Sequence, residues 1–380
     1  MKNVKKSKLP HIAAELLVLL ATVWMLLFPA EGGSYRRYAT DTLHYLRGTV
    51  SAIESETLHV STLGTGQKLG EQRLLVRLSD GREVSVTNCL TETHNILLKK
   101  GDSAIICADT PENAAPYYTV YNYDRTAPLI GLAVTFLLLL LLVGGRKGAD
   151  AGLSVLFTLV FILRVLLPVL YGGASPILMG LVTVLLSAAV TLILLHGISA
   201  HGFLSIGATM AGELIACCLF AVFSGLLHLT GFQTDCAEGL LLIAQNTGLQ
   251  VRMLLFAGMM IASLGAVMDV AVSILSAMRE VALAAGQAGR GMLFSSAMRL
   301  GQDMIGTMSN TLIFAFAGSA LVAMLVFCSY GVQLHQLLSS DYLAAELAQG
   351  LCSTAAVILT VPVSAGIGAL YYGKAAPKAA

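Results

Sequence analysis

The stretch that decides the fold is Ala127–Val143, APLIGLAVTFLLLLLLV, which contains no charged residue. A helix needs about 20 apolar residues to cross a hydrocarbon core of roughly 30 Å, so this stretch predicts a membrane-spanning helix. Similar stretches lie on both sides of it in the sequence. Together they predict eight spanning helices, at Ile12–Phe28, Ala127–Val143, Gly152–Tyr171, Ile177–Leu195, Phe203–Leu227, Val251–Ser276, Met304–Phe327 and Leu351–Tyr372.

The composition favours a membrane protein that carries one soluble module. Of the 380 residues, 56% are hydrophobic and 12% are charged, whereas soluble globular chains are roughly 25% charged. The segment from Glu31 to Thr126 holds 10 of the 23 Lys and Arg residues and 12 of the 22 Asp and Glu residues. The net charge is +1, and no Lys/Arg cluster is interleaved with aromatic residues, which excludes a nucleic-acid partner.

The distribution of positive charge predicts the orientation. With the amino terminus in the cytoplasm, the cytoplasmic segments collect eleven Lys and Arg residues, and the short outer loops Gly172–Pro176, His228–Gln250 and Cys328–Gly350 hold none. The positive-inside rule therefore places both termini in the cytoplasm. The residues after the first helix, Pro29–Gly33, lack a small-x-small cleavage pattern, so we expect this helix to stay as an uncleaved anchor.

The charged segment predicts a small β domain outside the cell. Hydrophobic and polar residues alternate in Gly48–Ile53 and Arg73–Leu78, as they do in strands, and Asp80-Gly81 is a strong hairpin signal. These features predict an antiparallel barrel, OB-like or SH3-like. Cys89 and Cys107 lie in this domain; they form a disulfide if their α-carbons are close on neighbouring strands, and are otherwise two free thiols.

The predicted fold class is thus a polytopic α-helical membrane protein with a small extracytoplasmic β-barrel-like domain. Residues 1–30 form a basic cytoplasmic tail and the first helix, and residues 31–126 form the β domain. Residues 127–373 form a seven-helix domain, and residues 374–380 form a cytoplasmic tail.

Two carboxylates lie within predicted spans, where an ionisable group costs several kcal/mol unless it is paired or hydrated. Glu213 lies about ten residues into its span, near mid-membrane at 1.5 Å per residue. Ser205, Thr209 and Gly212 are predicted to share its helical face. Asp269 belongs to a stripe of small or polar residues that recur every three or four positions: Gly258, Ala262, Gly265, Asp269, Ser273, Ser276 and Glu280.

A second polar face is predicted at the start of the next span, with Asp303, Gly306, Thr307, Asn310 and Thr311 over two helical turns. Both faces would lie toward the cytoplasmic half of the membrane, where they could meet. Small residues also allow membrane helices to pack closely, and this is the expected role of Gly258, Gly265 and Gly306. Packing does not require the carboxylates, so Glu213, Asp269, Ser273, Asp303, Thr307 and Asn310 are predicted to line a substrate or ion path.

Several strings resemble the bacterial YibE/F family of multi-pass membrane proteins. They are Gly265–Ile274 (GAVMDVAVSI), Gly306–Leu312 (GTMSNTL) and Gly197–Gly202 (GISAHG). One difference is that Leu300-Gly301-Gln302, just before Asp303, contains no basic residue, whereas the family tends to have one there. The resemblance implies one anchor helix, an external β-rich module and a seven-helix block in the bacterial plasma membrane, and a permease-like protein.

The leading functional prediction is a transporter or permease for a small solute or ion, with the membrane carboxylates linked to ion or proton movement. The alternative is a membrane-anchored scaffold or sensor whose β domain binds a ligand or an envelope partner. An enzyme is not expected, because Gly-x-Ser-x-Gly, His-Glu-x-x-His and Walker motifs are absent from the sequence. No cofactor or metal is predicted, and the expected partners are the lipid bilayer, the solute or ion, and an envelope protein or a second copy.

Overall fold

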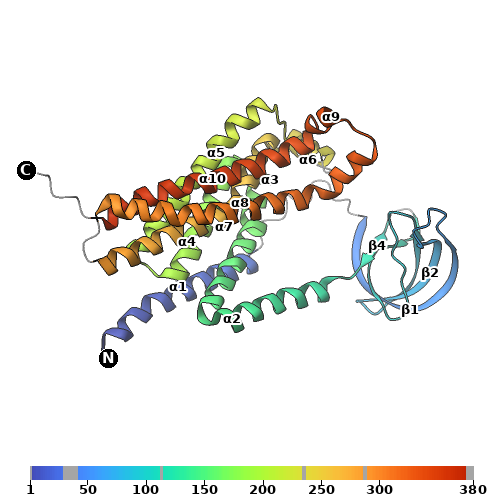
Figure 1. Cartoon of the computed structure of the whole chain (residues 1–380). Helices are drawn as coiled ribbons and strands as arrows, with labels where there is room; N and C mark the ends of the chain where they lie inside the picture. The colour runs from blue at the N-terminus through green and yellow to red at the C-terminus, as the bar shows by residue number, and fades with distance from the viewer. Residues whose placement is uncertain (1, 29–41, 112–113, 233–236, 286–288, 374–380) are drawn as a thin grey trace, which may run out of the picture. The chain divides into compact units, whose positions relative to one another are not determined.

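The computed structural model describes residues 2–28, 42–111, 114–232, 237–285 and 289–373 (Figure 1). The segment Pro29–Gly33, where no cleavage is expected, lies outside the described residues, as do Cys236 and the basic residues Lys374 and Lys378. The chain forms two compact units, one of residues 36–139 and one of residues 1–35 with residues 140–380.

The first unit contains a closed five-stranded barrel. Its strands are β1 (Leu43–Val60), β2 (Lys68–Leu78), β3 (Glu83–Leu90), β4 (Ser103–Asp109) and β5 (Tyr117–Tyr123), in the order β1-β2-β3-β5-β4. All pairs are antiparallel except β3 with β5. This order is that of an OB-fold, which decides between the two barrel types considered from the sequence.

Alternation along the strands builds the barrel core. The apolar side chains that point inward include Val50, Leu74, Val76, Val86 and Ile106, all of which are buried. The predicted hairpin at Asp80-Gly81 is confirmed: Gly81 has a φ of 88°, and the Leu78 amide donates to the Arg82 carbonyl at 2.8 Å. A barrel therefore forms where period-two alternation predicted strands.

The two cysteines of the barrel are free thiols. Cys89 is on β3 and Cys107 is on β4, and β5 lies between these strands in the barrel. The condition for a disulfide, two cysteines on neighbouring strands, is therefore not met.

The barrel is joined to a helix by a short, well-bonded link. Strand β5 ends at Tyr123 and helix α2 begins at Thr126. Arg47 of β1 lies 3.4 Å from the Asp124 carboxylate and donates to the Thr126 hydroxyl at 3.1 Å. The Thr126 amide also donates to Asp124 at 3.0 Å, so the link is fixed on both sides.

The remaining elements are helical: α1 (Lys2–Leu27), α2 (Thr126–Phe161), the π-helix η1 (Ile162–Leu166), α3 (Leu167–Tyr171), α4 (Pro176–His196), α5 (Ala200–Leu226), α6 (Ala237–Thr247), α7 (Val251–Ala285), α8 (Arg290–Ser329), α9 (Leu334–Leu338) and α10 (Asp341–Tyr372). Six described helices are long and apolar enough to cross a membrane: Thr126–Tyr171, α4, α5, α7, α8 and α10.

The structure has six such helices among the described residues, two fewer than the eight stretches predicted from the sequence, for two reasons. The apolar part of α1 spans only His11–Leu27, and the second and third predicted spans are joined in the single segment Thr126–Tyr171. That segment is interrupted at Gly145, whose φ of 56° and ψ of −133° are not helical. A Cβ on Gly148 would lie 1.8 Å from the Leu140 carbonyl oxygen, although eight residues along a straight helix extend about 12 Å. The chain therefore turns back on itself near Gly145.

The main helical core is built from α4, α5, α7, α8 and α10. Its buried side chains include Phe220, Met259, Ile274, Val357 and Val361. A smaller cluster packs α1 against the end of α2 and α4, through Val18, Met25, Phe157, Phe161 and Leu194. Helix α5 is central, and its contacts with α7 and α10 position the candidate site.

Candidate functional site

One face of α5 carries a row of buried polar residues, which we call the α5 polar row: His201, Ser205, Thr209 and Glu213. Ser205, Thr209 and Glu213 are each 0% exposed, and His201 is 6% exposed. The predicted shared face of Ser205, Thr209, Gly212 and Glu213 is confirmed, since all four are buried. The spacing of four residues per step brings each side chain about one helical turn from the next.

The Glu213 carboxyl has a single hydrogen-bonding side chain among the described residues. The Ser263 hydroxyl of α7 lies 2.9 Å and 3.2 Å from its two oxygens, and also 3.0 Å from the Met259 carbonyl. A serine hydroxyl has one proton to donate. Glu213 can therefore accept that proton as a carboxylate, or donate its own proton to Ser263 while Ser263 donates to Met259.

Helices α5, α7 and α10 approach closely beside this carboxyl. A Cβ on Gly212 would lie 2.3 Å from the Thr360 hydroxyl oxygen and 2.6 Å from a Val267 methyl carbon. Ser364, one turn further along α10 than Thr360, has a buried hydroxyl without a partner among the described residues. Buried polar groups of this kind are typical positions for internal water.

The His201 end of the row is surrounded by further polar groups. His201 Nδ1 lies 3.0 Å from the Tyr372 hydroxyl, and His201 Nε2 lies 3.2 Å from the Ser276 hydroxyl. The His196 ring packs edge-on at 5.2 Å. The partners of His201 could not be predicted from the sequence, because Ser276 and Tyr372 are distant from it in the chain.

The other end of α5 is closed by aromatic side chains. Phe220 is fully buried and packs against Phe256 of α7, with ring centroids 4.8 Å apart. Beyond it, Arg252 donates to the Ser224 hydroxyl at 3.4 Å. The row from His201 to Glu213 is therefore polar at every turn, whereas an apolar layer separates Glu213 from Ser224.

The predicted stripe on α7 lies on an exposed face. Gly258, Gly265, Asp269 and Ser273 are all exposed, and Ser276 is half-buried beside His201. A Cβ on Gly258 or Gly265 would meet nothing within 4 Å. Within the described part of the chain these glycines make no close helix contact, and their predicted role in helix packing stays a prediction.

The predicted face on α8 is exposed as well. Asp303, Gly306, Thr307, Asn310 and Thr311 are exposed, and a Cβ on Gly306 would meet no neighbour. The opposite face packs on the core through Met304, Ile305, Met308 and Leu312. No hydrogen bond or ion pair joins Glu213, Asp269 and Asp303 among the residues described, so the structure does not gather the predicted path residues into one cluster.

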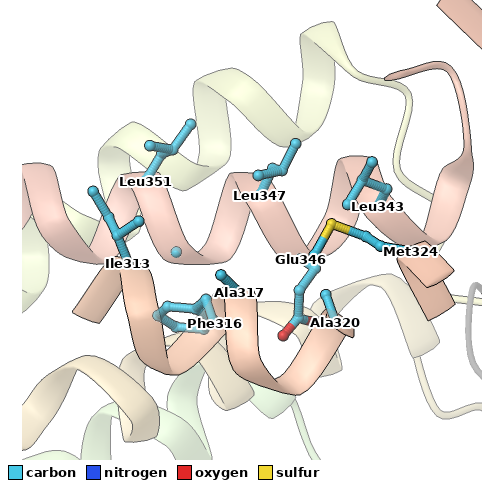
Figure 2. Close-up of a pocket in the computed structure, with 10 residues that line it drawn as sticks. Ile313, Phe316, Ala317, Ala320, Met324, Leu343, Glu346, Leu347 and Leu351 are labelled. Carbon is cyan, nitrogen blue, oxygen red and sulfur yellow. The ribbon is translucent and has the colours of Figure 1, made fainter. Parts of the chain in front are cut away.

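An apolar crevice of about 90 Å³ lies between α8 and α10 (Figure 2). Glu346 is its one ionisable lining residue, and the Ser319 hydroxyl donates to the Glu346 carboxylate. Helix α10 begins at Asp341, ten residues before the predicted span, which is why Glu346 was expected in a loop. The lining includes Ile313, Phe316, Met324, Leu343, Glu346 and Leu351.

A group of charged side chains that we did not predict from the sequence joins α1 to α2. It contains His11, Glu15, Arg146 and Asp150. His11 and Glu15 are four residues apart, as are Arg146 and Asp150, and this spacing places each pair on one helical face. The spacing is a weak signal because it does not reveal that the two pairs meet across 131 positions of sequence.

The fold defines a class: a polytopic α-helical membrane protein that also carries a five-stranded β-barrel domain. Within that class the chain belongs to the YibE/F family, since the family model described as YibE/F-like protein matches residues 132–374. This confirms the resemblance seen in the sequence. The match covers the helices from α2 to α10 and includes neither α1 nor the barrel. Comparison with curated proteins and with solved structures gave no match.

Proposed function

We propose that the protein is a permease that couples movement of a small solute or ion to protonation of Glu213. The α5 polar row carries this proposal. It places one buried polar side chain per helical turn between a fully buried carboxyl and a polar helix end, and the hydroxyls of Ser205 and Thr209 donate to the carbonyls of His201 and Ser205. A carboxyl in a spanning helix that has only a serine hydroxyl as partner is stable when protonated or cation-bound, so its charge state can respond to ion access.

The dimensions of the row suit a half-path through a bilayer. His201 and Glu213 are twelve residues apart, which is about 18 Å along a helix and roughly half of a hydrocarbon core. The fully buried Phe220 and its contact with Phe256 close the other half. With the orientation predicted from the positive charges, protons reach Glu213 from the cytoplasm in the state described.

The exposed residues Asp269, Ser273, Asp303, Thr307 and Asn310 are proposed to face the transported solute or ion. The side chains of Asp269, Ser273, Asp303 and Asn310 lie on spanning helices without a hydrogen-bond partner in the described chain, and Thr307 donates only to the Met304 carbonyl of its own helix, at 3.0 Å. Lipid does not satisfy such groups, so water, a substrate or another chain must contact them.

Proton uptake into potassium-loaded liposomes tests the role of Glu213. The full chain is reconstituted, valinomycin imposes an inside-negative potential, and an enclosed pH-sensitive dye reports uptake. We expect Glu213→Gln to lower the rate by about tenfold or more, and Ser205→Ala with Thr209→Val to lower it less. Glu346→Gln is the matched control, because Glu346 is also a spanning-helix carboxyl bonded to a serine.

A Glu213→Gln protein that takes up protons at the wild-type rate would exclude Glu213 as the coupling group. The solute itself can be sought separately, by comparing metabolite and metal profiles of cells that lack or overproduce the protein.

A specific feature of the barrel favours the second candidate function, a ligand-binding sensor or scaffold. Strands β1, β2 and β3 form an open, polar concavity lined by Ser55, Thr57, His59, Glu71 and Arg73. The strand 2–3 face is where OB-folds bind oligomeric ligands. Arg73→Glu reverses one charge of this concavity. If the barrel is the functional site, this variant should abolish the phenotype that the wild-type gene supports in cells and leave proton uptake intact.

A further inference from the structure

The ionic group between α1 and α2 has a geometry that suits a bound cation. The ligating atoms of His11, Glu15 and Asp150 all lie within 4.8 Å of one another. Asp150 is 7% exposed, and His11 Nε2 at 3.7 Å is the nearest Lys, Arg or His nitrogen to it among the side chains described, which in α1 begin at His11. Among these side chains and the described backbone, no N–H or hydroxyl group donates a hydrogen bond to this carboxylate. Asp150 is therefore a buried carboxylate with a gap in front of it.

The contacts of the His11 ring differ in a way that assigns a role to each nitrogen. Nδ1 lies 2.6 Å from the Glu15 carboxylate and 3.2 Å from Arg146 Nη2, and the shorter contact is a hydrogen bond from Nδ1–H to Glu15. Nε2 lies 3.7 Å from the Asp150 carboxylate, which is too long for one. With Nδ1 protonated and bonded to Glu15, the lone pair of Nε2 points to the gap.

The 3.7 Å gap matches the separation of two ligands on one metal ion. Zinc lies about 2.1 Å from histidine nitrogen and carboxylate oxygen. Two such ligands are about 3.4 Å apart at the tetrahedral angle, and a separation of 3.7 Å needs an angle of about 120°. The contact is thus too wide for a hydrogen bond and suitable for a bridging ion.

The surrounding residues complete the arrangement. Arg146 donates to Glu15 at 2.8 Å, which fixes the carboxylate that orients His11. A histidine that binds metal usually donates its other N–H to such a carboxylate. With His11 neutral, two carboxylates and one guanidinium leave a net charge of −1, which favours a cation. An open pocket lined by Glu15, Arg146 and Asp150 gives room for water ligands.

We propose that His11 Nε2 and the Asp150 carboxylate bind a first-row divalent cation of the zinc type, with water as the remaining ligands and Glu15 and Arg146 as positioning residues. A mixed imidazole and carboxylate set favours such ions over magnesium or calcium, which take oxygen ligands. The ion would join α1 to α2, and its binding does not depend on transport.

Zinc titration of the full chain in detergent tests this site, with a fluorescent chelator as competitor and a tag that contains no histidine. We expect one zinc ion per chain and weak binding of magnesium. His11→Gln and Asp150→Asn should each weaken zinc binding by about tenfold or more, since each removes a direct ligand. Glu15→Gln should weaken it less.

Two variants separate a metal site from an ion-pair network. Arg146→Gln frees the Glu15 carboxylate that orients His11, so zinc affinity should fall about as much as in Glu15→Gln, whereas a network that only pairs charges would bind no zinc in the wild type or in any variant. His44→Gln, at an exposed barrel histidine, is the matched control and should bind as the wild type does. Equal zinc binding by the wild type, His11→Gln and Asp150→Asn would overturn the proposal.

X-ray absorption of the zinc-loaded wild type gives an answer that does not depend on how the variants fold. We expect imidazole nitrogen and oxygen scattering with no sulfur. A spectrum without imidazole, or one dominated by sulfur from the cysteines, would also overturn it.

Discussion

Glu213 and Asp269 are both carboxylates in spanning helices, but their surroundings differ. Glu213 is enclosed by α5, α7 and α10 and bonded to Ser263. Asp269 lies on the exposed face of α7, beside Gly265 and Ser273. A substitution at Asp269 therefore changes charge without disturbing the core.

Asp269→Asn tests whether this charge is used. The amide keeps the shape and hydrogen-bonding capacity of the side chain, so we expect a stability cost of about 1 kcal/mol or less and normal abundance. If the carboxylate takes part in coupling, transport or complementation should be lost, and Ser273→Ala should weaken it less. Full complementation by Asp269→Asn at several pH values and sodium concentrations would contradict a coupling role.

At the scale of helices, Gly212 controls the approach of α5 to its neighbours. A Cβ at this position would lie 2.3 Å from the Thr360 hydroxyl oxygen, so Gly212→Ala should destabilise the protein by about 1–3 kcal/mol through overpacking. Gly265→Ala is the matched control in a spanning helix, since its Cβ would meet nothing. Thermal unfolding in detergent should show a lower midpoint for Gly212→Ala alone; equal midpoints would refute the close packing.

The α5 face was predictable because its residues are neighbours on one helix, and the period of the helix alone places Ser205, Thr209 and Glu213 together. The contact of His201 with Tyr372 was not predictable, because 171 positions of sequence separate the two residues. The faces of α7 and α8 were correctly identified as small and polar. Their exposure depends on how each helix is rotated against the core, which local sequence does not determine.

Gly145 shows the same limit for element boundaries. Hydropathy placed two spans on either side of Gly144–Ala151, and a non-helical residue does divide this region. The φ of 56° and ψ of −133° at Gly145 separate two helices within the segment Thr126–Phe161, and hydropathy alone could not locate that break at a particular residue.

At the scale of the whole molecule, the barrel residues 36–124 are expected to fold alone. A hydrogen bond from the Arg82 side chain lowers the pKa of Asp80, and hydrogen bonds from Thr126, together with the positive charge of Arg47, lower the pKa of Asp124. Because the pKa of each carboxyl is lower in the folded domain than the ordinary value of 3.8, the two carboxylates stabilise the fold above that pH. This stabilisation is lost as the pH falls through the folded-state pKa values.

We therefore expect a soluble domain with a β-type circular dichroism spectrum and a melting temperature that declines below about pH 4. Ending the domain at residue 124 removes the Thr126 bonds, so Asp80 gives the clearer signal, and Asp80→Asn should make the decline less steep. A helical or unfolded spectrum at pH 7 would contradict an independent barrel.

The orientation of the chain follows from charge and can be tested by labelling. The seven native cysteines are first replaced, and Lys68→Cys is introduced at an exposed position of the barrel. An impermeant thiol reagent should label it in intact cells, because the barrel is expected outside. Glu280→Cys, in the expected cytoplasmic part of α7, should label only after the membrane is opened; the reverse pattern would invert the topology.

The bonded link between β5 and α2 has a mechanical consequence. Only Asp124 and Arg125 separate the last strand from the helix, and Arg47 ties both sides of the link to β1. A ligand that twists the barrel therefore moves the first turns of α2 with it, without slack. The part of α2 that ends at Leu139 belongs to the same compact unit as the barrel, so any rotation of the barrel is passed directly to this helix.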